Sequence, residues 1–338
     1  MKIVFRVDAS LKMGIGHVMR CLTLANEFKL QNHEIFFICR ELPGNLISLI
    51  KYPVLVLPNN EAFHKDDLYL NWLGASQERD LEQTIKVIPK NTDLVIVDNY
   101  ALDEIWHKSL RLHTKKLMVI DDLADRKFDC DILLNQNLGT QILEYSDKVP
   151  NDCELLLGCD FALLRPEFQL LREKALAKRK KTKEIKNILI SLGGVDLSNK
   201  AYSILEDIPD YFNVVVILGG HSQHNEMIIN YAKNKKNVNV MIDADNISRL
   251  MLDADLAIGA GGSTSWERCC LGLPTLLYVL AENQRKIAES LEKLGAVKIV
   301  DNLNENLQNL LNNFTLWQTM SEKAQIICDG AGVKRIKI

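Results

Sequence analysis

The sequence lacks the features that would place it in a membrane, secreted or nucleic-acid-binding class. None of its apolar runs reaches the roughly 18 residues that span a bilayer. Arg6 and Asp8 interrupt the first apolar segment, where a signal peptide would continue. The formal net charge of -3 gives no long-range attraction for nucleic acid. We therefore expect a cytoplasmic protein that has neither a membrane nor a nucleic acid as its partner.

The sequence also lacks any Cys-x-x-Cys pair among its eight cysteines, most of which lie in apolar runs. This pattern argues against a zinc knuckle or a disulfide framework and indicates buried, reduced thiols. The 338 residues are 47% hydrophobic and 25% charged, which is typical of a soluble globular protein. A chain of this length is expected to form two domains.

Short apolar runs alternate along the chain with segments of helical period, which predicts parallel sheets with helices on both faces. Helices are predicted from His17 to Leu30 and from Asp103 to Leu112. Strands are predicted at Ile3 to Val7, Glu34 to Cys39, Val54 to Leu57, Leu94 to Val97 and Leu117 to Ile120, and then at Ile188 to Ser191, Val214 to Leu218, Val238 to Ile242, Leu256 to Ile258, Thr275 to Val279 and Val297 to Val300.

The break between the two series of strands predicts the domain boundaries. We expect an N-terminal α/β domain over residues 1–165, a basic linker helix over 166–186 and a C-terminal α/β domain over 187–338. Two Rossmann-type domains facing a central cleft would hold a ligand at the carboxyl ends of their strands. The basic residues between Arg172 and Lys186 suit either a patch for anionic partners or a solvated helix, and the solvated helix is favoured.

The first candidate site follows the first strand. Gly14 and Gly16 allow the backbone to approach a ligand closely, and His17 opens the next helix. Met19 stands where a dinucleotide fingerprint needs its third glycine, and no Gly-Lys-Ser/Thr follows as in a Walker loop. The partial positive charge of a helix start disfavours an imidazolium, so His17 is expected to be a neutral general base. The alternative is that His17 only caps the helix.

A second candidate site follows the strand predicted at Leu256 to Ile258. Gly261 and Gly262, with the hydroxyls of Ser263 and Thr264, form a turn suited to a diphosphate. Glu267, one turn into the helix, is placed to accept two ribose hydroxyls. Another turn, at Gly193 and Gly194, could lie near the same phosphates, although a tight strand-to-helix connection is the favoured explanation for this turn alone.

Other polar residues have two interpretations each. His221 and His224 flank a glycine turn, but without a cysteine or carboxylate partner a surface loop is favoured over a metal site. Asp98, Asp121 and Asp122 lie at strand ends, where each would order water or the sugar, or cap a helix. We expect no metal and no other cofactor.

At this point two known families match. Gly-Gly-Ser-Thr-Ser-x-Glu, followed by Gly272-Leu273-Pro274, resembles the uridine-diphosphate site of MurG-like glycosyltransferases of the GT-B fold. The N-terminal Arg-Val-Asp-Ala-Ser and residues 14–21 match a narrower family. They resemble PseG, the family of UDP-2,4-diacetamido-2,4,6-trideoxy-β-L-altropyranose hydrolases of pseudaminic acid biosynthesis. The resemblance extends over the whole chain through the motifs at residues 97–100, 120–126, 134–137, 192–196, 282–284 and 329–330.

This resemblance implies a metal-independent, inverting hydrolysis in which water attacks the anomeric carbon and UDP leaves. His17 would deprotonate the water, and Tyr100 and Asn283 would contact the sugar or the water, with Gln284 sharing that task. Glu267 would hold the uridine diphosphate together with Ser263 and Thr264. Because UDP leaves as a stabilised anion, one base can suffice where an ordinary glycosidase needs two carboxylates. A monomer is expected, and the surface glycan that the product feeds, flagellin or another, stays open.

Three alternatives remain. A MurG-like UDP-sugar glycosyltransferase would share the fold, and an acceptor-binding apolar patch would distinguish it. The segment from Leu46 to Ile50 suits such a patch, or else the face of a core helix. A non-catalytic nucleotide-sugar binding protein would leave His17 without a task. An epimerase-hydrolase would need carboxylates near the sugar. A serine-nucleophile mechanism is not indicated, because no G-x-S-x-G turn is present.

Overall fold

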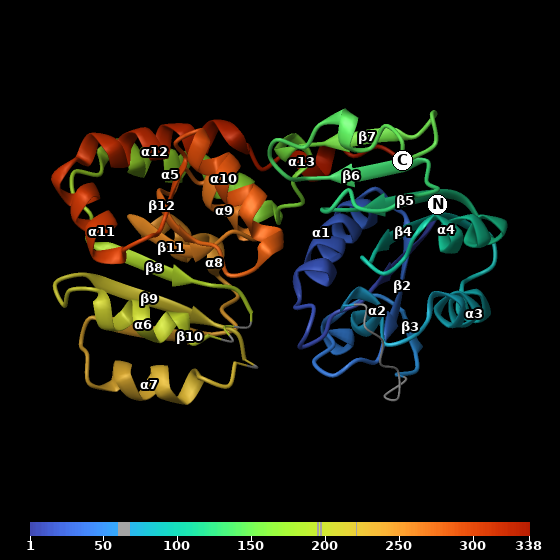
Figure 1. The fold of residues 1–338 in the computed structure, drawn as a ribbon, viewed down its shortest axis with the longest axis horizontal. Coiled ribbons are helices and arrows are strands. Elements are labelled where there is room, and N and C mark those ends of the chain that lie inside the picture. Colours follow the sequence, from blue (N-terminus) through green and yellow to red (C-terminus); the bar gives the residue numbers. More distant parts are fainter. Residues whose placement is uncertain (60–67, 195, 197, 221) are drawn as a thin grey trace. The chain divides into compact units, whose positions relative to one another are not determined.

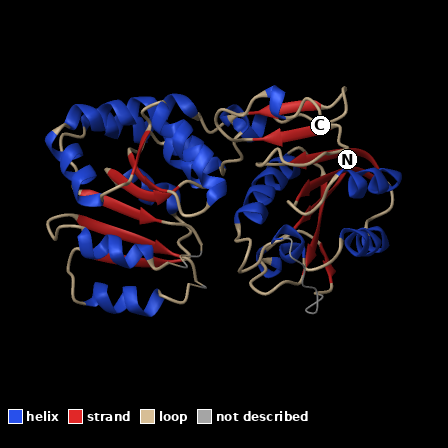
Figure 2. Cartoon of the chain, in the orientation of Figure 1, coloured by secondary structure: helices blue, strands red, loops and turns tan. Residues whose placement is uncertain are grey.

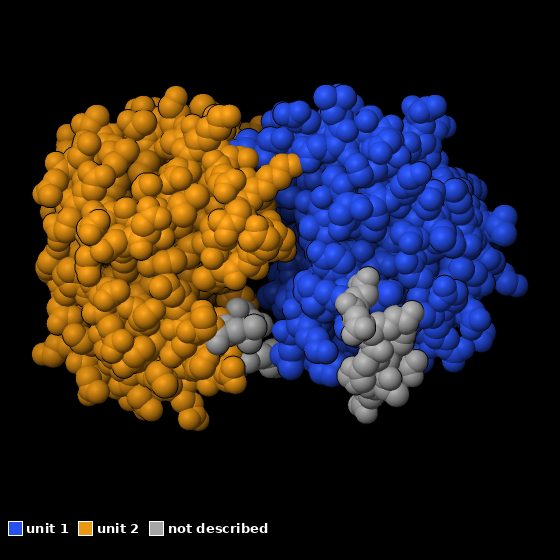
Figure 3. Space-filling view, in the orientation of Figure 1, with its two compact units in different colours: residues 1–163, 333–338 blue, residues 164–332 orange. Residues whose placement is uncertain are grey.

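The computed structural model describes residues 1–59, 68–194, 196, 198–220 and 222–338. The described residues divide into two compact units, unit 1 (residues 1–163 and 333–338) and unit 2 (residues 164–332), which are coloured separately in Figure 3. Val195 and His221 lie outside the described residues, so the metal interpretation of His221 and the loop position of Val195 stay predictions.

The described residues of unit 1 form a seven-stranded parallel sheet with the order β3-β2-β1-β4-β5-β6-β7 (Figure 1). The five predicted strands are all present. Two further strands of four residues each were not predicted. The strands are β1 (Lys2–Val7), β2 (Glu34–Arg40), β3 (Val54–Leu57), β4 (Thr92–Asp98), β5 (Thr114–Ile120), β6 (Ile132–Asn135) and β7 (Glu154–Leu157).

Helices cover both faces of this sheet (Figure 2). Successive side chains of β1 explain why: Phe5 packs in one apolar cluster with Phe28, while Val4 packs in another with Trp106 on the opposite face. The helices are α1 (Gly16–Leu30), α2 (Leu68–Leu73), α3 (Gln77–Val87) and α4 (Glu104–Leu110), with short 3-10 turns η1 (Ile47–Leu49), η2 (Arg111–His113), η3 (Ile142–Glu144) and η4 (Cys159–Phe161).

The part of unit 2 that the structure describes forms a six-stranded parallel sheet with the order β10-β9-β8-β11-β12-β13. All six predicted strands are present. They are β8 (Asn187–Ser191), β9 (Asn213–Leu218), β10 (Val238–Ile242), β11 (Leu256–Ala260), β12 (Thr275–Tyr278) and β13 (Val297–Ile299). The helices are α5 (Pro166–Lys181), α6 (Lys200–Asp207), α7 (Asn225–Lys233), α8 (Ile247–Asp253), α9 (Thr264–Cys270), α10 (Arg285–Lys293), α11 (Leu303–Asn312) and α12 (Phe314–Ile327), with the 3-10 turn η5 (Glu282–Gln284) before α10.

Both sheets reverse their strand order beside their first strand, between β1 and β4 in unit 1 and between β8 and β11 in unit 2. At such a switch point the connections leave in opposite directions and open a crevice at the carboxyl ends of the strands. Both predicted sites therefore begin at the position in their own sheet where parallel α/β folds bind ligands.

The domain boundaries differ from those predicted. The basic helix α5 belongs to unit 2 rather than to a separate linker. Arg172 donates to the carbonyls of Cys270 and Gln325 at 2.5 and 2.7 Å, and the buried Arg179 donates to the carbonyl of Met251 at 2.6 Å. Arg172 and Arg179 are thus hydrogen-bonded to main-chain carbonyls of unit 2, so the favoured solvated-helix interpretation is wrong for these two residues.

The end of the chain differs as well. After α13 (Gly332–Arg335) begins, residues 333–338 return to unit 1, where Val333 and Ile336 join the apolar cluster of α1. The predicted C-terminal domain of 187–338 therefore includes about six residues at its end that belong to unit 1. An apolar pair so close to a terminus gives no sign in the sequence of which core it joins.

The described residues contain no helix that is both long and apolar enough to cross a membrane. All eight cysteines lie in the described part of the chain and are free thiols, and burial raises the pKa of most of them, including Cys269 to about 12. These thiols pack as small apolar groups, as predicted.

One buried histidine offers a test of the packing of unit 1. His107 on α4 is fully buried, and neither ring nitrogen has a hydrogen-bond partner among the described residues. Burial, with a smaller effect of Arg126 and Arg111, lowers its pKa from 6.5 to about 3. The folded protein therefore holds the ring neutral, whereas the unfolded chain binds a proton once the pH falls below about 6.5.

We predict that this difference makes stability depend on pH. The contribution of His107 is fully present above the unfolded pKa and is lost as the pH falls toward 3. Between pH 7 and pH 5 the free energy of unfolding should fall by about 2 kcal/mol more in the wild type than in His107→Leu. Urea unfolding at both pH values measures this, with the exposed His113→Gln as the control that keeps the wild-type slope. Equal slopes in the wild type and His107→Leu would contradict the prediction.

Candidate active site

The unit 1 site is built on the turn between β1 and α1. Gly14 has a φ of 80°, which a glycine adopts without strain, and its N–H donates to the carbonyl of Ser10 at 2.8 Å. A Cβ added at Gly14 or Gly16 would meet no atom within 4 Å. Both glycines therefore border open space, which agrees with the predicted close approach of a ligand.

His17 is the second residue of α1 and is 6% exposed. The helix has no side-chain cap, so the alternative role of His17 as a cap is not realised. Instead, the Nδ1 atom of His17 lies 2.7 Å from Oδ1 of Asp98, at the carboxyl end of β4. Two residues that are 81 positions apart in the sequence meet at the switch point of the sheet.

Asp98 is held ionised by two basic neighbours. Arg20, one turn after His17, donates from Nε to Oδ2 and from Nη2 to Oδ1, both at 2.7 Å. Burial raises the pKa of Asp98, but the charge and hydrogen bonds of Arg20, together with the hydrogen bond of His17, outweigh burial and hold this pKa well below its usual value. The carboxylate can therefore only accept hydrogen bonds.

This network determines the tautomer of the neutral imidazole. Because Asp98 only accepts, the Nδ1 atom of His17 carries the hydrogen, and the lone pair lies on Nε2. The Nη2 atom of Arg20 is 3.3 Å from the same Nδ1 but 2.7 Å from Oδ1 of Asp98, so its hydrogen bond goes to the carboxylate. His17 thus has a free basic nitrogen on the side of the ring away from Asp98.

Tyr100 lies against His17, with ring centroids 4.7 Å apart in an edge-to-face contact. Its hydroxyl donates to Oδ2 of Asp122 at 2.7 Å, and Nη1 of Arg20 donates to the same oxygen at 2.6 Å. Burial and the Asp122 charge raise the pKa of Tyr100, so it remains a neutral phenol. The partly exposed rings of Tyr69 and Trp72 flank Tyr100, with centroids at 5.5 and 6.3 Å.

The three aspartates at strand ends separate into two roles. Asp121 accepts the N–H groups of Leu123 and Ala124 at 3.1 and 2.7 Å and the Tyr145 hydroxyl at 2.7 Å, so it holds its own loop. Asp98 and Asp122 instead join the network of His17 and Tyr100. Arg20, which connects those two carboxylates, was missed as a site residue, although its spacing of three from His17 places both on one helix face.

The unit 2 site is built on the turns after β8 and β11. Gly193 has a φ of 101° and, like Gly262, would meet no atom within 4 Å if it carried a Cβ. A Cβ at Gly261 would lie 3.2 Å from Cβ of Gln284, so a side chain there would require Gln284 to shift by a few tenths of an ångström. A Cβ at Gly219 would lie 2.0 Å from the carbonyl oxygen of Gly194, which brings the turn after β8 against the turn after β9.

Glu267 lies on α9 with 14% of its side chain exposed. Its Oε1 atom is 3.5 Å from Nη2 of Arg165, and its buried Oε2 atom has no hydrogen-bond partner among the described residues. Burial raises the pKa of Glu267, and the charge of Arg165 opposes this only in part. An unpartnered buried acceptor costs free energy, which a bound donor would recover.

The remaining predicted residues lie on the turn η5 and at the start of α9. Gln284 accepts the N–H of Leu280 at 3.0 Å and packs its Cβ on Gly261, so in this structure it supports the glycine turn. Ser263 and Asn283 are exposed, and Thr264 is partly exposed. The structure thus gathers the residues that follow β11 and β12, and separately gathers His17 and Tyr100 in unit 1.

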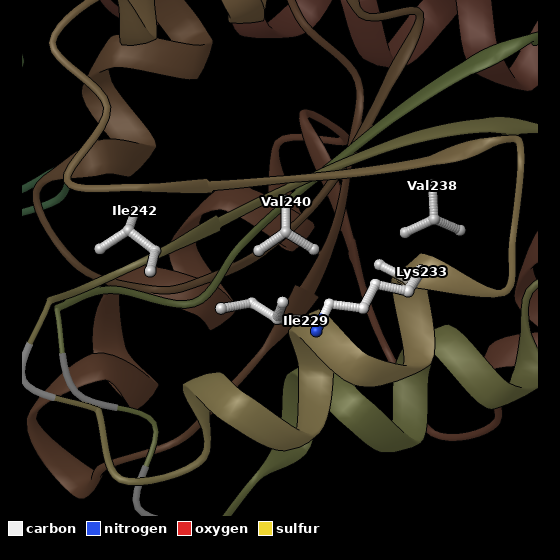
Figure 4. A pocket seen from close by; sticks show the side chains of 6 residues that line it. Ile229, Lys233, Val238, Val240 and Ile242 are labelled. Atoms are coloured by element: carbon white, nitrogen blue, oxygen red, sulfur yellow. The ribbon is translucent and has the colours of Figure 1, made fainter.

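Outside the two sites we looked for a metal centre and for a groove. Among the described residues no group of three or more His, Cys, Asp or Glu side chains is arranged to hold a metal ion. A shallow groove of about 360 Å³ runs between α7 and β10, and Figure 4 shows the apolar side chains of Ile229, Val238, Val240 and Ile242 lining it beside Lys233. None of the predicted site residues contributes to this groove.

Comparison with known proteins supports the predicted resemblance. Residues 187–328 match the glycosyltransferase family 28 C-terminal domain. Over 296 residues the chain is 28% identical to the UDP-2,4-diacetamido-2,4,6-trideoxy-beta-L-altropyranose hydrolase of Campylobacter jejuni, covering 87% of this chain and 97% of the relative. It is 32% identical over 305 residues to an uncharacterized protein of Methanocaldococcus jannaschii; this covers 85% of the chain but only 57% of the relative's length.

Solved structures confirm the fold. MurG of Acinetobacter baumannii superposes with a TM-score of 0.62 at 16% identity, covering 98% of this chain and 97% of the other. The UDP complex of MnaA from S. aureus gives 0.64 at 11% identity, covering 99% and 94%. The chain therefore has the GT-B fold, with its two parallel-sheet α/β domains.

The His17 tautomer is open to direct measurement. We predict that two-dimensional ¹⁵N–¹H spectra of the wild type at a pH where the ring is neutral show the hydrogen on Nδ1. In Asp98→Asn the amide can donate to Nδ1, so the hydrogen should move to Nε2. Asp122→Asn is the matched control and should keep the wild-type tautomer, because Asp122 hydrogen-bonds to Arg20, Tyr100 and Asn137 rather than to His17. A hydrogen on Nε2 in the wild type would contradict the assignment.

Proposed function

We propose that this protein hydrolyses a UDP-sugar, releasing UDP and a free sugar by attack of water at the anomeric carbon. The observation that carries the proposal is the His17–Asp98 contact of 2.7 Å at the switch point of unit 1, which leaves Nε2 of His17 as a free base. The sequence similarity to the Campylobacter hydrolase supports UDP-2,4-diacetamido-2,4,6-trideoxy-β-L-altropyranose as the substrate.

In this proposal Nε2 of His17 removes a proton from water as the oxygen attacks the anomeric carbon. Asp98 keeps the ring in the correct tautomer and stabilises the imidazolium that forms, and Arg20 holds Asp98 in place. The new C–O bond forms on the face opposite to UDP, so the configuration inverts. A positioned base of this kind typically contributes about 10² to 10⁴-fold in rate.

The departing group explains why no second carboxylic acid is required. UDP leaves as a stabilised anion, so its oxygen does not need the proton that an alkoxide leaving group takes from an acid. Ser263 and Thr264, with the turns at Gly193-Gly194 and Gly261-Gly262, would bind the diphosphate. The unpartnered Oε2 atom of Glu267 would accept the ribose hydroxyls.

We expect the sugar to contact Tyr100 in unit 1. Tyr100 presents its ring beside His17, and the open space at Gly14 and Gly16 leaves room for the sugar or for the attacking water. Asn283 is exposed and free to hydrogen-bond, and Gln284 would act mainly by supporting the Gly261 turn.

A glycosyltransferase is the second candidate, favoured by the match to the family 28 C-terminal domain. Its acceptor patch was expected in the segment from Leu46 to Ile50. There, Leu46 and Ile47 pack against the core of unit 1 and Ile50 is buried, while Leu49 is 59% exposed. A patch reduced to one exposed side chain gives the transferase little support from this segment.

We predict that the purified wild type releases UDP from the diacetamido-trideoxy sugar nucleotide when no acceptor and no metal is added. His17→Gln should lower kcat by about 10²-fold or more while UDP still binds, because the base is lost and the diphosphate site is not changed. UDP release by coupled assay and UDP affinity by calorimetry provide the two measurements. UDP binding without turnover in the wild type would favour a binding protein, and turnover only with an acceptor would favour the transferase.

A separate prediction concerns the ribose. Glu267→Gln should weaken binding of UDP by about tenfold or more and leave 2′,3′-dideoxy-UDP almost unaffected, because only the ribose hydroxyls use the carboxylate. Glu167→Gln is a matched control, since Glu167 also contacts Arg165, at 3.2 Å, without lying on α9. Equal losses for both nucleotides in Glu267→Gln would show that Glu267 does not bind the ribose.

A further inference from the structure

A buried arginine lies beneath the glycine turn after β11. Arg268 is 2% exposed and follows Thr264 by one helical turn on α9. Its Nη2 atom donates to the carbonyl of Ala260 at 2.6 Å and to Oγ of Ser265 at 3.0 Å. Its Nη1 atom donates to Oγ1 of Thr264 at 3.3 Å.

The missing side chain at Gly259 leaves room for this guanidinium. A Cβ on Gly259 would lie 2.3 Å from Nη1 of Arg268 and 3.1 Å from the carbonyl oxygen of Ser191. Gly259 belongs to β11 and Ser191 to β8, the two strands at which the order of the sheet reverses. The guanidinium therefore occupies the switch point of unit 2, where the turns at Gly193 and Gly261 leave the sheet.

No ion pair joins Arg268 to a carboxylate of the described residues, and the charge of its sequence neighbour Glu267 offsets its burial only in part. Its buried Nε atom has no hydrogen-bond partner among the described residues. Burial lowers the pKa of Arg268 to about 10, which leaves it charged at neutral pH. A buried cation without a counter-ion is costly, and protein interiors normally pair it. An anion bound at the adjacent turn would offset that cost.

The direction of the hydrogen bonds adds a second argument. Arg268 has only donors, so Oγ1 of Thr264 accepts from it and the hydroxyl hydrogen of Thr264 must point to another acceptor. Ser265 also accepts from Arg268 but is 1% exposed, whereas Thr264 is partly exposed. Thr264 is thus the hydroxyl that can present its hydrogen to a ligand.

We propose that Arg268 is a positioning residue for a nucleoside diphosphate: it turns the Thr264 hydroxyl into a donor toward the diphosphate and places a buried positive charge beneath it. This inference rests on the proposed function, in which the turn after β11 binds UDP. The buried charge of Arg268 would make the site bind a nucleoside diphosphate more tightly than an uncharged nucleoside, and so would favour a charged leaving group.

The test compares binding of UDP and of uridine to the full-length protein by calorimetry. Arg268→Met removes the charge and the donors but keeps an unbranched apolar chain. It should lower the ratio of UDP to uridine affinity by about tenfold to a hundredfold, while uridine affinity stays close to that of the wild type. Arg179→Met, which removes another buried arginine of unit 2 far from this turn in the sequence, is the control and should leave the ratio unchanged.

Two threonine variants keep the test decisive if Arg268→Met does not fold. Thr264→Val should lower the UDP to uridine ratio, and Thr264→Ser, which retains the hydroxyl, should preserve it. An unchanged ratio in Arg268→Met or in Thr264→Val would overturn the inference, as would equal losses of UDP and uridine. A wild type that binds no UDP would instead overturn the proposed function.

Discussion

The ion pair between Asp98 and Arg20, with His17 bound to the same carboxylate, is the interaction on which the unit 1 site depends. A fully buried carboxylate at the end of a central strand must be paired, because its desolvation is otherwise too costly. Both of its basic partners come from one face of α1, three residues apart. The same contacts that satisfy Asp98 therefore fix α1 against β4 and determine which nitrogen of His17 is free.

The two units use one topology for opposite electrostatic purposes. In unit 1 the switch point between β1 and β4 holds a carboxylate that supports a base. In unit 2 the switch point between β8 and β11 holds the guanidinium of Arg268, beneath the turn proposed to bind a diphosphate. In the proposed reaction water gives a proton to a base and the departing diphosphate gains a negative charge, so each kind of environment has a use.

Much of the fold follows from local pattern, and the site follows only in part. Buried strands and the glycine turns are visible as apolar runs and breaks, so His17 and Glu267 could be named from the sequence. The partner of His17 could not, because Asp98, Asp121 and Asp122 look equivalent as acids after strands, and only the strand order shows which one reaches α1. The destination of residues 333–338 and the role of Arg268 likewise depend on contacts between distant segments.

The central claim is that a water molecule activated by His17 attacks carbon rather than phosphorus. Hydrolysis of the UDP-sugar in ¹⁸O-labelled water, followed by mass spectrometry of both products, tests it most directly. The account predicts the label in the free sugar and none in UDP. Label in UDP would mean attack at phosphorus and would contradict the account.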